Sequence, residues 1–322
     1  MEDVFIIVFS NNEFDRSVQG LIGAGRELAD SSSSRLGAII VGPINPGLNA
    51  EIAGYADKVV VLAQPELNEY NPETYLSALA DVLSRLSSRT VLFANDTYSQ
   101  ELTPRLAFRL KGSATGDAAK VDLVDGSIRV MRQVYGGKAE ALFELKRNPA
   151  VVWIRSRSFN PAQRLNSSGA IVEMSVQIST DIRTKLVEKQ DAAQAEARLE
   201  DATVIVSGGR GIGGSEAFVD LQELANEMGA QMGASRAVCD AGWVPPTWQV
   251  GQTGKKVSPN LYLAIAISGA SQHLAGISEA KVIAAINTDQ DAPIFKHCQF
   301  GIVEDYKKVL PLLRQRIAEL KN

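Results

Sequence analysis

Short aliphatic and β-branched runs alternate with longer amphipathic segments through the first third of the chain. The apolar runs predict strands at 4–9, 36–41, 59–62 and 91–94, and the amphipathic segments predict helices at 14–29, 72–86 and 102–110. Strands that follow one another with helices between them are typical of βαβ units. We therefore expect a parallel sheet with helices on both faces.

The pattern changes between residues 120 and 154. Short strands are predicted at 121–123, 127–133, 138–145 and 151–154, and Asp125-Gly126, Gly136-Gly137 and Asn148-Pro149 separate them. Gly-containing dipeptides between alternating strands favour tight hairpins. These strands predict a β-meander that closes the first domain.

A second α/β pattern begins after a charged, alanine-containing segment without Gly or Pro. It predicts strands at 203–207, 231–234, 261–267 and 282–286, and helices at 215–228, 271–274 and 305–321. A chain of 322 residues exceeds the usual size of a single hydrophobic core. We expect an N-terminal α/β domain that serves as a subunit interface (1–180), a connector (181–202) and a second doubly wound domain (203–322).

Composition narrows the function without defining it. The chain is 45% hydrophobic and 22% charged with a net charge of −4, which fits a folded globular protein and offers no strong field for nucleic acid or acidic membranes. Cys239 and Cys298 lack metal-site spacing, and no signal peptide or membrane-length apolar stretch is evident. The sequence predicts a cytoplasmic protein of a reducing compartment, without a metal site.

A glycine-rich turn follows the first strand of the second domain. Gly209 to Gly214 form a GxGxxG pattern with Arg210 inside it, and such turns let a backbone approach a pyrophosphate. A tight turn without a ligand remains the alternative. The acidic residue that a dinucleotide fold places about 20 residues further on is absent, and Ser235-Arg236 stands there instead. Arg236 is suited to a 2′-phosphate, to an aromatic ring system or to a surface carboxylate.

Five blocks further along resemble the alpha subunit of electron transfer flavoproteins. They read GASRAVCDAGWVP at 233–245, QVGQTGK at 249–255, SGASQHLAG at 268–276, AINTD at 285–289 followed by APIF at 292–295, and GIVED at 301–305. The first domain resembles the family more loosely, through VYGGKA at 134–139 and the strand at 152–159. Three places depart from the family: Arg155-Ser156 replaces Arg-Pro, Tyr306 replaces Leu, and Pro246-Thr247-Trp248 precedes Gln249.

The resemblance implies a nucleotide-hydrolase-like first sheet and a Rossmann-like second domain that binds FAD. It implies Arg236 beside the flavin ring, the Thr253 hydroxyl near N5 and His273 near O2, where a cation or strong donor favours reduction. His297 is read as structural. The implied cofactor-binding residues are Arg210, Gly211, Ser235, Arg236, Gln249, Val250, Gly251, Gln252, Thr253, Ser268, Gly269, Ala270, Ser271, Gln272, His273, Asn287, Asp305 and Tyr306. Without the family, Ser268, Asn287 and Asp305 would read as caps or turns.

The family also implies an electron carrier rather than a substrate-converting enzyme. Its donors include the acyl-CoA dehydrogenases of fatty acid β-oxidation, its acceptors include a quinone oxidoreductase, and its beta subunit forms a heterodimer and binds AMP or a second FAD. One alternative is a bifurcating complex that oxidises NADH. Another is an autonomous NAD(P)-dependent oxidoreductase, against which the missing acidic residue and the lack of a Tyr-Lys or His-Asp pair count.

Overall fold

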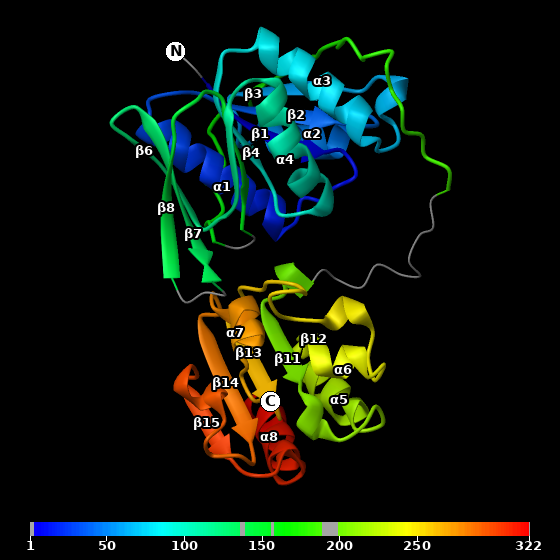
Figure 1. The fold of residues 1–322 in the computed structure, drawn as a ribbon, viewed down its shortest axis with the longest axis vertical. Coiled ribbons are helices and arrows are strands. Elements are labelled where there is room, and N and C mark those ends of the chain that lie inside the picture. The colour runs from blue at the N-terminus through cyan, green and yellow to red at the C-terminus, as the bar shows by residue number, and fades with distance from the viewer. Residues whose placement is uncertain (1–2, 136–138, 156–157, 189–198, 322) are drawn as a thin grey trace. The chain divides into compact units, whose positions relative to one another are not determined.

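The computed structural model describes residues 3–135, 139–155, 158–188 and 199–321. The chain divides into two compact units, one drawn from Met1–Gln133 and Glu140–Ala192 and the other mostly from Ala193–Asn322 (Figure 1). Each unit has its own sheets and hydrophobic cores. Among the described residues, no helix combines the length and the apolar character that a membrane crossing requires.

The first unit contains a seven-stranded sheet in the order β10-β3-β2-β1-β4-β9-β5. All of its neighbouring strands pair in parallel, as the alternating pattern predicted. Its strands are β1 (Asp3–Phe9), β2 (Leu36–Val41), β3 (Lys58–Leu62), β4 (Ser88–Phe93), β5 (Ser113–Ala118), β9 (Ala150–Ile154) and β10 (Ala170–Glu173).

Helices cover both faces of this sheet. They are α1 (Arg16–Ser31), α2 (Pro46–Ala53), α3 (Pro72–Arg85) and α4 (Thr97–Arg109). One core joins α1 and α2 to alternate residues of β1 such as Ile6, and the other joins α3 and α4 to residues such as Ile7. Each helix begins after an Asp or Asn whose side chain accepts a backbone N–H, which fixes its first turn. The predicted doubly wound architecture is confirmed.

The predicted meander is smaller than expected. β6 (Lys120–Val124), β7 (Ser127–Val134) and β8 (Ala139–Leu145) form a separate three-stranded sheet, in which β6 and β7 pair antiparallel. The fourth predicted strand, 151–154, belongs instead to β9, between β4 and β5 in the parallel sheet. Val151 and Val152 point to opposite faces and are both buried, which only an interior strand satisfies. The Gly136-Gly137 turn lies outside the described residues.

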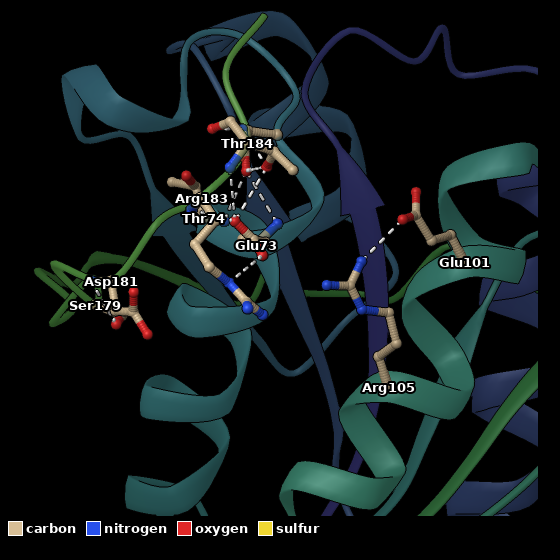
Figure 2. A network of polar contacts seen from close by, with 9 residues as sticks. Glu73, Thr74, Glu101, Arg105, Ser179, Asp181, Arg183 and Thr184 are labelled. Carbon is tan, nitrogen blue, oxygen red and sulfur yellow. Dashed lines mark hydrogen bonds and ion pairs between the residues drawn. The ribbon is translucent and has the colours of Figure 1, made fainter.

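An extended segment without helix or strand, residues 175–184, runs along α3. Side chains of α3 that stand four residues apart form hydrogen bonds with the backbone of this segment. Arg85 donates to the Ser175 carbonyl, and Asp81 accepts from the Gln177 amide. Ser77 accepts from the Ser179 amide, and Glu73 accepts from the amides of Arg183 and Thr184. Figure 2 shows the Glu73 end of this row. A helix advances about 6 Å in four residues, and an extended chain covers the same distance in about two residues. The contacts of Arg85, Asp81 and Ser77 therefore fall on every second residue of the segment.

The second unit is a five-stranded parallel sheet in the order β12-β11-β13-β14-β15. Its strands are β11 (Val204–Gly208), β12 (Gln231–Ala234), β13 (Leu261–Ile265), β14 (Val282–Asn287) and β15 (Phe300–Val303). Its helices are α5 (Phe218–Met228), α6 (Arg236–Asp240), α7 (Ser271–Ile277) and α8 (Tyr306–Lys321). Residues of α5 and α8 share one core with one face of the sheet, and α7 and the 250–257 loop share the other.

The chain leaves β11 for β12 on one side and returns to β13 on the other, so strand order reverses at β11. Such a reversal leaves a crevice at the carboxyl ends of the strands. Several sequence expectations need correction here. The helix predicted from residue 215 begins at Phe218, the 261–267 strand ends at Ile265, the 271–274 helix extends to Ile277, and the 203–207 strand is shifted by one residue. The short elements α6 and β15 were not predicted. Residues 189–198 of the predicted connector, 181–202, lie outside the described residues.

Candidate functional site

A cleft of about 690 Å³ lies at the carboxyl edge of the second sheet. It is lined from the ends of four strands, β11, β12, β13 and β14, and from the loop before β13. All the implied cofactor residues except Ser271, Asp305 and Tyr306 line it. Arg236, Thr253 and His273, far apart in sequence, thus border one cavity, while their contact with a flavin stays a prediction.

The glycine-rich turn only partly follows the dinucleotide pattern. Gly209 and Gly211 border the cleft on either side of Arg210, and Gly209 N donates to the Ile265 carbonyl at 2.9 Å. The turn continues as a short 3-10 helix, and α5 begins four residues beyond Gly214. No residue of α5 lines the cleft, so the start of that helix does not border it. Within the turn, Ile212 N and Gly213 N donate to the carbonyls of Gly209 and Arg210.

Arg236 forms the surface carboxylate pair, one of its three proposed readings, and it also borders the cleft. It is the first residue of α6, with Ser235 as N-cap, and its side chain borders the cleft. Its Nε donates to Asp240 Oδ2 at 3.2 Å, so the surface pair exists as well. Both side chains are well exposed, 66% and 62%, which leaves the guanidinium able to reorient toward a ligand.

The loop 249–254 is held by hydrogen bonds at several points. Val250 N donates to Ala234 O at 2.9 Å, and Gln252 N donates to Gln272 O at 2.7 Å. Gln249 Nε2 donates to Thr253 Oγ1 at 3.0 Å, which orients that hydroxyl. The loop backbone passes so close to α7 that a Cβ on Gly276 would lie 2.5 Å from Gly251 N. The predicted loop is thus an ordered wall of the cleft.

The junction between β13 and α7 adopts a backbone that few residues tolerate. Gly269 has φ +83°, and a Cβ there would lie 2.4 Å from Ile294 N. Ala266 also has positive φ, 54°, an uncommon state for a residue with a side chain. The N-cap of α7 is Ala270, which supplies no side-chain bond, so the reading of Ser268 as an ordinary N-cap is wrong. The first amides of α7 keep no side-chain acceptor.

Burial sets the charge of His273, for which the sequence left a cation and a neutral donor open. Its side chain is 6% exposed, and its Nε2 lies 2.9 Å from the Tyr262 hydroxyl. Burial lowers the pKa of His273 to about 4, and the Val250 backbone offsets this only in part. The imidazole is therefore neutral at pH 7. Within the described chain, Nδ1 is buried without a hydrogen-bond partner.

A smaller cavity of about 260 Å³ adjoins the cleft and shares Gly211, Ala266 and Asn287 with it. Asp305 and Tyr306 line this second cavity. Asp305 Oδ1 also accepts from Lys307 N, so the residue caps α8. Tyr306 is buried, and its hydroxyl donates to Ile212 O at 3.0 Å, a bond that the family's leucine lacks. Asn287 Nδ2 donates to Ile267 O at 2.9 Å, which ties the two strand ends together.

The cleft also contains residues that sequence reasoning missed. They are Ala237, Asp240, Ala266, Ile267 and Asp289. Asp240 had a usable signal, since it stands four residues after Arg236 on a short helix. Ser271 is at the start of α7 but does not line either cavity. Pro246–Trp248 form a short 3-10 helix outside both linings, and Ser156 lies outside the described residues.

The two adjoining cavities fit an elongated ligand with a phosphate in its middle. The larger volume lies within the usual range for cofactor sites of about 300–1,000 Å³. Gly211, Ala266 and Asn287 border both cavities, and Arg210, next to Gly211, lines the larger one. The residues whose placement is described contain no group of three or more His, Cys, Asp or Glu suited to a metal ion. The fold and cleft define an α/β protein of the dinucleotide-binding class.

Comparison with known proteins identifies the family. Residues 4–179 match the electron transfer flavoprotein domain, and residues 198–278 match the electron transfer flavoprotein FAD-binding domain. The chain is 38% identical to the electron transfer flavoprotein subunit alpha of Thermoanaerobacterium thermosaccharolyticum, covering 94% of this chain and 93% of that protein. It is 38% identical to the corresponding subunit of Bacillus subtilis, over 93% and 92%. It is 34% identical to protein FixB of Clostridium saccharobutylicum, over 93% and 91%.

The chain belongs to the electron transfer flavoprotein alpha subunit family. The matched FAD-binding domain makes FAD its cofactor, as the sequence blocks at 233–305 implied. The cleft residues lie within and just beyond the matched segment.

Proposed function

We propose that the chain is the FAD-carrying half of a heterodimeric electron carrier that accepts electrons from dehydrogenases and passes them to a separate acceptor. Bound FAD supplies one- and two-electron chemistry. The cleft residues divide into two groups. The turn at Arg210 and Gly211 and the junction before α7 hold the cofactor, and Arg236, Thr253 and His273 adjust how readily it is reduced.

The observation that carries the proposal is the meeting of these three side chains at one cavity. Arg236 brings a cation, Thr253 a hydroxyl oriented by Gln249, and His273 a neutral imidazole. None of them forms a hydrogen-bonded nucleophile–base pair with another residue of the cleft among the described residues. This arrangement suits the tuning of a bound redox group better than the conversion of a substrate.

A beta-type subunit is the expected partner, with AMP or a second FAD of its own. The test is to co-express this chain with such a subunit and record the absorption spectrum after adding FAD and removing the excess. A flavin band at about one FAD per alpha chain, bleached by an acyl-CoA dehydrogenase with its substrate, supports the proposal. A pair that retains no flavin contradicts it.

The bifurcating complex is the second candidate within the family. NADH would bleach the flavin of the purified pair rapidly in that case, and slowly or not at all in a simple carrier. The autonomous NAD(P)-dependent oxidoreductase would instead turn over NADH with a small substrate as the single chain. The GxGxxG turn alone favours it, and the cleft offers no acidic residue at the β12 end, where Ser235 and Arg236 stand.

A further inference from the structure

The glycine-rich turn is held at its beginning by the end of β13. Gly209 N donates to the Ile265 carbonyl at 2.9 Å, and a Cβ on Gly209 would lie 2.1 Å from the Ala266 carbonyl oxygen. Gly211 packs against the same residue, since a Cβ there would lie 3.1 Å from Ala266 Cβ. This side of the turn therefore has little room to move.

Tyr306, the first residue of α8, bonds the other end of the turn. It is 5% exposed, and its hydroxyl lies 3.0 Å from the carbonyl oxygen of Ile212, 94 residues away in the sequence. A carbonyl oxygen has no hydrogen to give, so the phenol is the donor of this bond. Among the described residues, no backbone amide donates to this carbonyl. The tyrosine hydroxyl thus satisfies a buried polar group of the turn.

The residues between these two anchors border the cavities. Ile212 N donates to Gly209 O at 3.1 Å, which closes the turn. Arg210 lines the larger cavity, and Gly211 lines both. Fixing both ends of a short turn leaves it fewer conformations before a ligand binds, and a preorganised site loses less entropy on binding.

We propose that Tyr306 is a positioning residue for FAD, which fixes the turn at Arg210 and Gly211 through its hydroxyl rather than by a polar contact of its own with the cofactor. The hydroxyl has one hydrogen, and the Ile212 carbonyl accepts it. The family's usual leucine has no donor for this bond, so the bond depends on the tyrosine of this chain. The inference rests on the proposed function, because that proposal assigns the turn to holding FAD.

A residue that acts on the turn should change how tightly FAD is held without changing how readily it is reduced. Removing the hydroxyl leaves the Ile212 carbonyl without this donor and allows the turn more conformations, which FAD must restrict when it binds. That cost is the same for oxidised and reduced FAD, so it cancels from the midpoint potential. A change beside the flavin ring would not cancel, because reduction alters the charge there.

The experiment compares Tyr306→Phe and Tyr306→Leu with the unaltered chain, each in complex with a beta-type subunit. Titration of the flavin-free complex with FAD gives the dissociation constant, and spectroelectrochemistry of the reloaded complex gives the midpoint potential. Both variants should raise the dissociation constant about three- to tenfold and leave the midpoint potential unchanged. In the flavin-free complex, hydrogen exchange of the Ile212 and Gly213 amides should be faster in both variants.

Tyr75→Phe is the matched control. Tyr75 is 4% exposed in the first unit, and its hydroxyl donates to the Leu67 carbonyl at 2.8 Å, so this variant also removes a buried phenol donor from a backbone carbonyl. Its complex should bind FAD with an unchanged dissociation constant. An equal loss of FAD affinity in Tyr75→Phe and Tyr306→Phe would show that only overall stability matters, and would overturn the inference.

Other results would overturn it as well. Weaker binding in Tyr306→Leu with unchanged binding in Tyr306→Phe would assign the effect to the aromatic ring, and a shifted midpoint potential would place it at the flavin. Exchange of the Ile212 and Gly213 amides at the rate of an unfolded peptide, in the unaltered flavin-free complex, would exclude a fixed turn whether or not either variant folds.

The two proposals fail in different ways. A complex that never retains flavin refutes the proposed function and this inference with it. A flavin-loaded complex whose FAD affinity is unchanged in Tyr306→Phe refutes only the role of Tyr306.

Discussion

The carboxylate of Glu73, at the start of α3, accepts hydrogen bonds from the amide and the hydroxyl of Thr184 and from the amide of Arg183. Glu73 Oε2 accepts from the Thr184 amide at 3.0 Å and from its hydroxyl at 3.1 Å, and it accepts from the Arg183 amide at 2.7 Å (Figure 2). Glu73 is also the acidic residue in the first turn of α3. One side chain thus fixes the end of the extended segment 175–184 and complements the helix dipole.

Neutralising Glu73 should loosen this segment. Hydrogen bonds from the Arg183 and Thr184 amides lower the pKa of Glu73. A lowered folded-state pKa stabilises the fold at neutral pH, and that stabilisation fades as pH falls from the ordinary glutamate value through the lowered one. Hydrogen exchange of residues 175–184 should be several-fold faster in Glu73→Gln, with the ratio to the unaltered protein approaching one in acid. The control is Glu66→Gln, because Glu66 is exposed and precedes α3 by a few residues. Equal rates at neutral pH would refute this role.

The buried pair Arg155 and Asp117 should dominate the stability of the β5–β9 edge. Arg155 Nε and a second guanidinium nitrogen donate to the two carboxylate oxygens of Asp117 at 2.8 and 2.9 Å, and both side chains are buried. Removing one partner of a buried pair costs about 3–5 kcal/mol. Arg155→Met should lower the opening free energy of β5 and β9, measured by native-state exchange, by about that amount. Adding Asp117→Asn should recover part of it.

The surface pair of Arg35 and Asp3, in which the Arg35 side chain is 72% exposed and the Asp3 side chain 16%, provides the comparison for that measurement. Arg35→Met should change the opening free energy far less, because water screens the charges of a surface pair. A loss in Arg155→Met no larger than in Arg35→Met would show that the buried pair contributes little.

The close approach of Gly276 to Gly251 should control FAD affinity from outside the cleft. A methyl group at Gly276 would lie 2.5 Å from Gly251 N and 2.6 Å from its Cα, and must displace the 249–254 loop. We expect Gly276→Ala to raise the dissociation constant of FAD at least tenfold, about 1.4 kcal/mol. Gly214→Ala has open space around it and should bind FAD normally, although it alters the GxGxxG pattern. Equal affinities in fluorescence titration would contradict this account.

Arg236 and Asp240 should move the flavin potential in opposite directions. They are paired at 3.2 Å and both border the cleft. Reduction adds negative charge to the flavin, so Arg236→Gln should lower the midpoint potential and Asp240→Asn should raise it. We expect shifts of tens of millivolts that shrink at high salt, because both groups are exposed. Spectroelectrochemical titration measures them, with Arg316→Gln on α8 as control. Shifts of the same sign would exclude a direct charge effect.

Hydrophobic periodicity anticipated most of the secondary structure, because each helix and parallel strand is encoded within a few residues. The run at 231–234 coincides with β12, and the run at 36–41 coincides with β2. The position of β9 in the large sheet could not be predicted from neighbouring residues alone. Its alternating-turn context favours a hairpin, and only burial of Val151 and Val152 on both faces of the large sheet selects the interior position.

The functional site also has features that the sequence predicts and features that only the folded structure decides. By itself, the sequence determined the parallel α/β architecture, the family and most residues around the cleft, since these depend on periodicity and on motifs contiguous in the chain. Tertiary structure alone decided the neutrality of His273, the contact of its ring with Tyr262 and the closeness of Gly276 to Gly251. Burial and hydrogen-bond geometry set those properties, and they depend on residues that neighbour each other only after the sheet has formed.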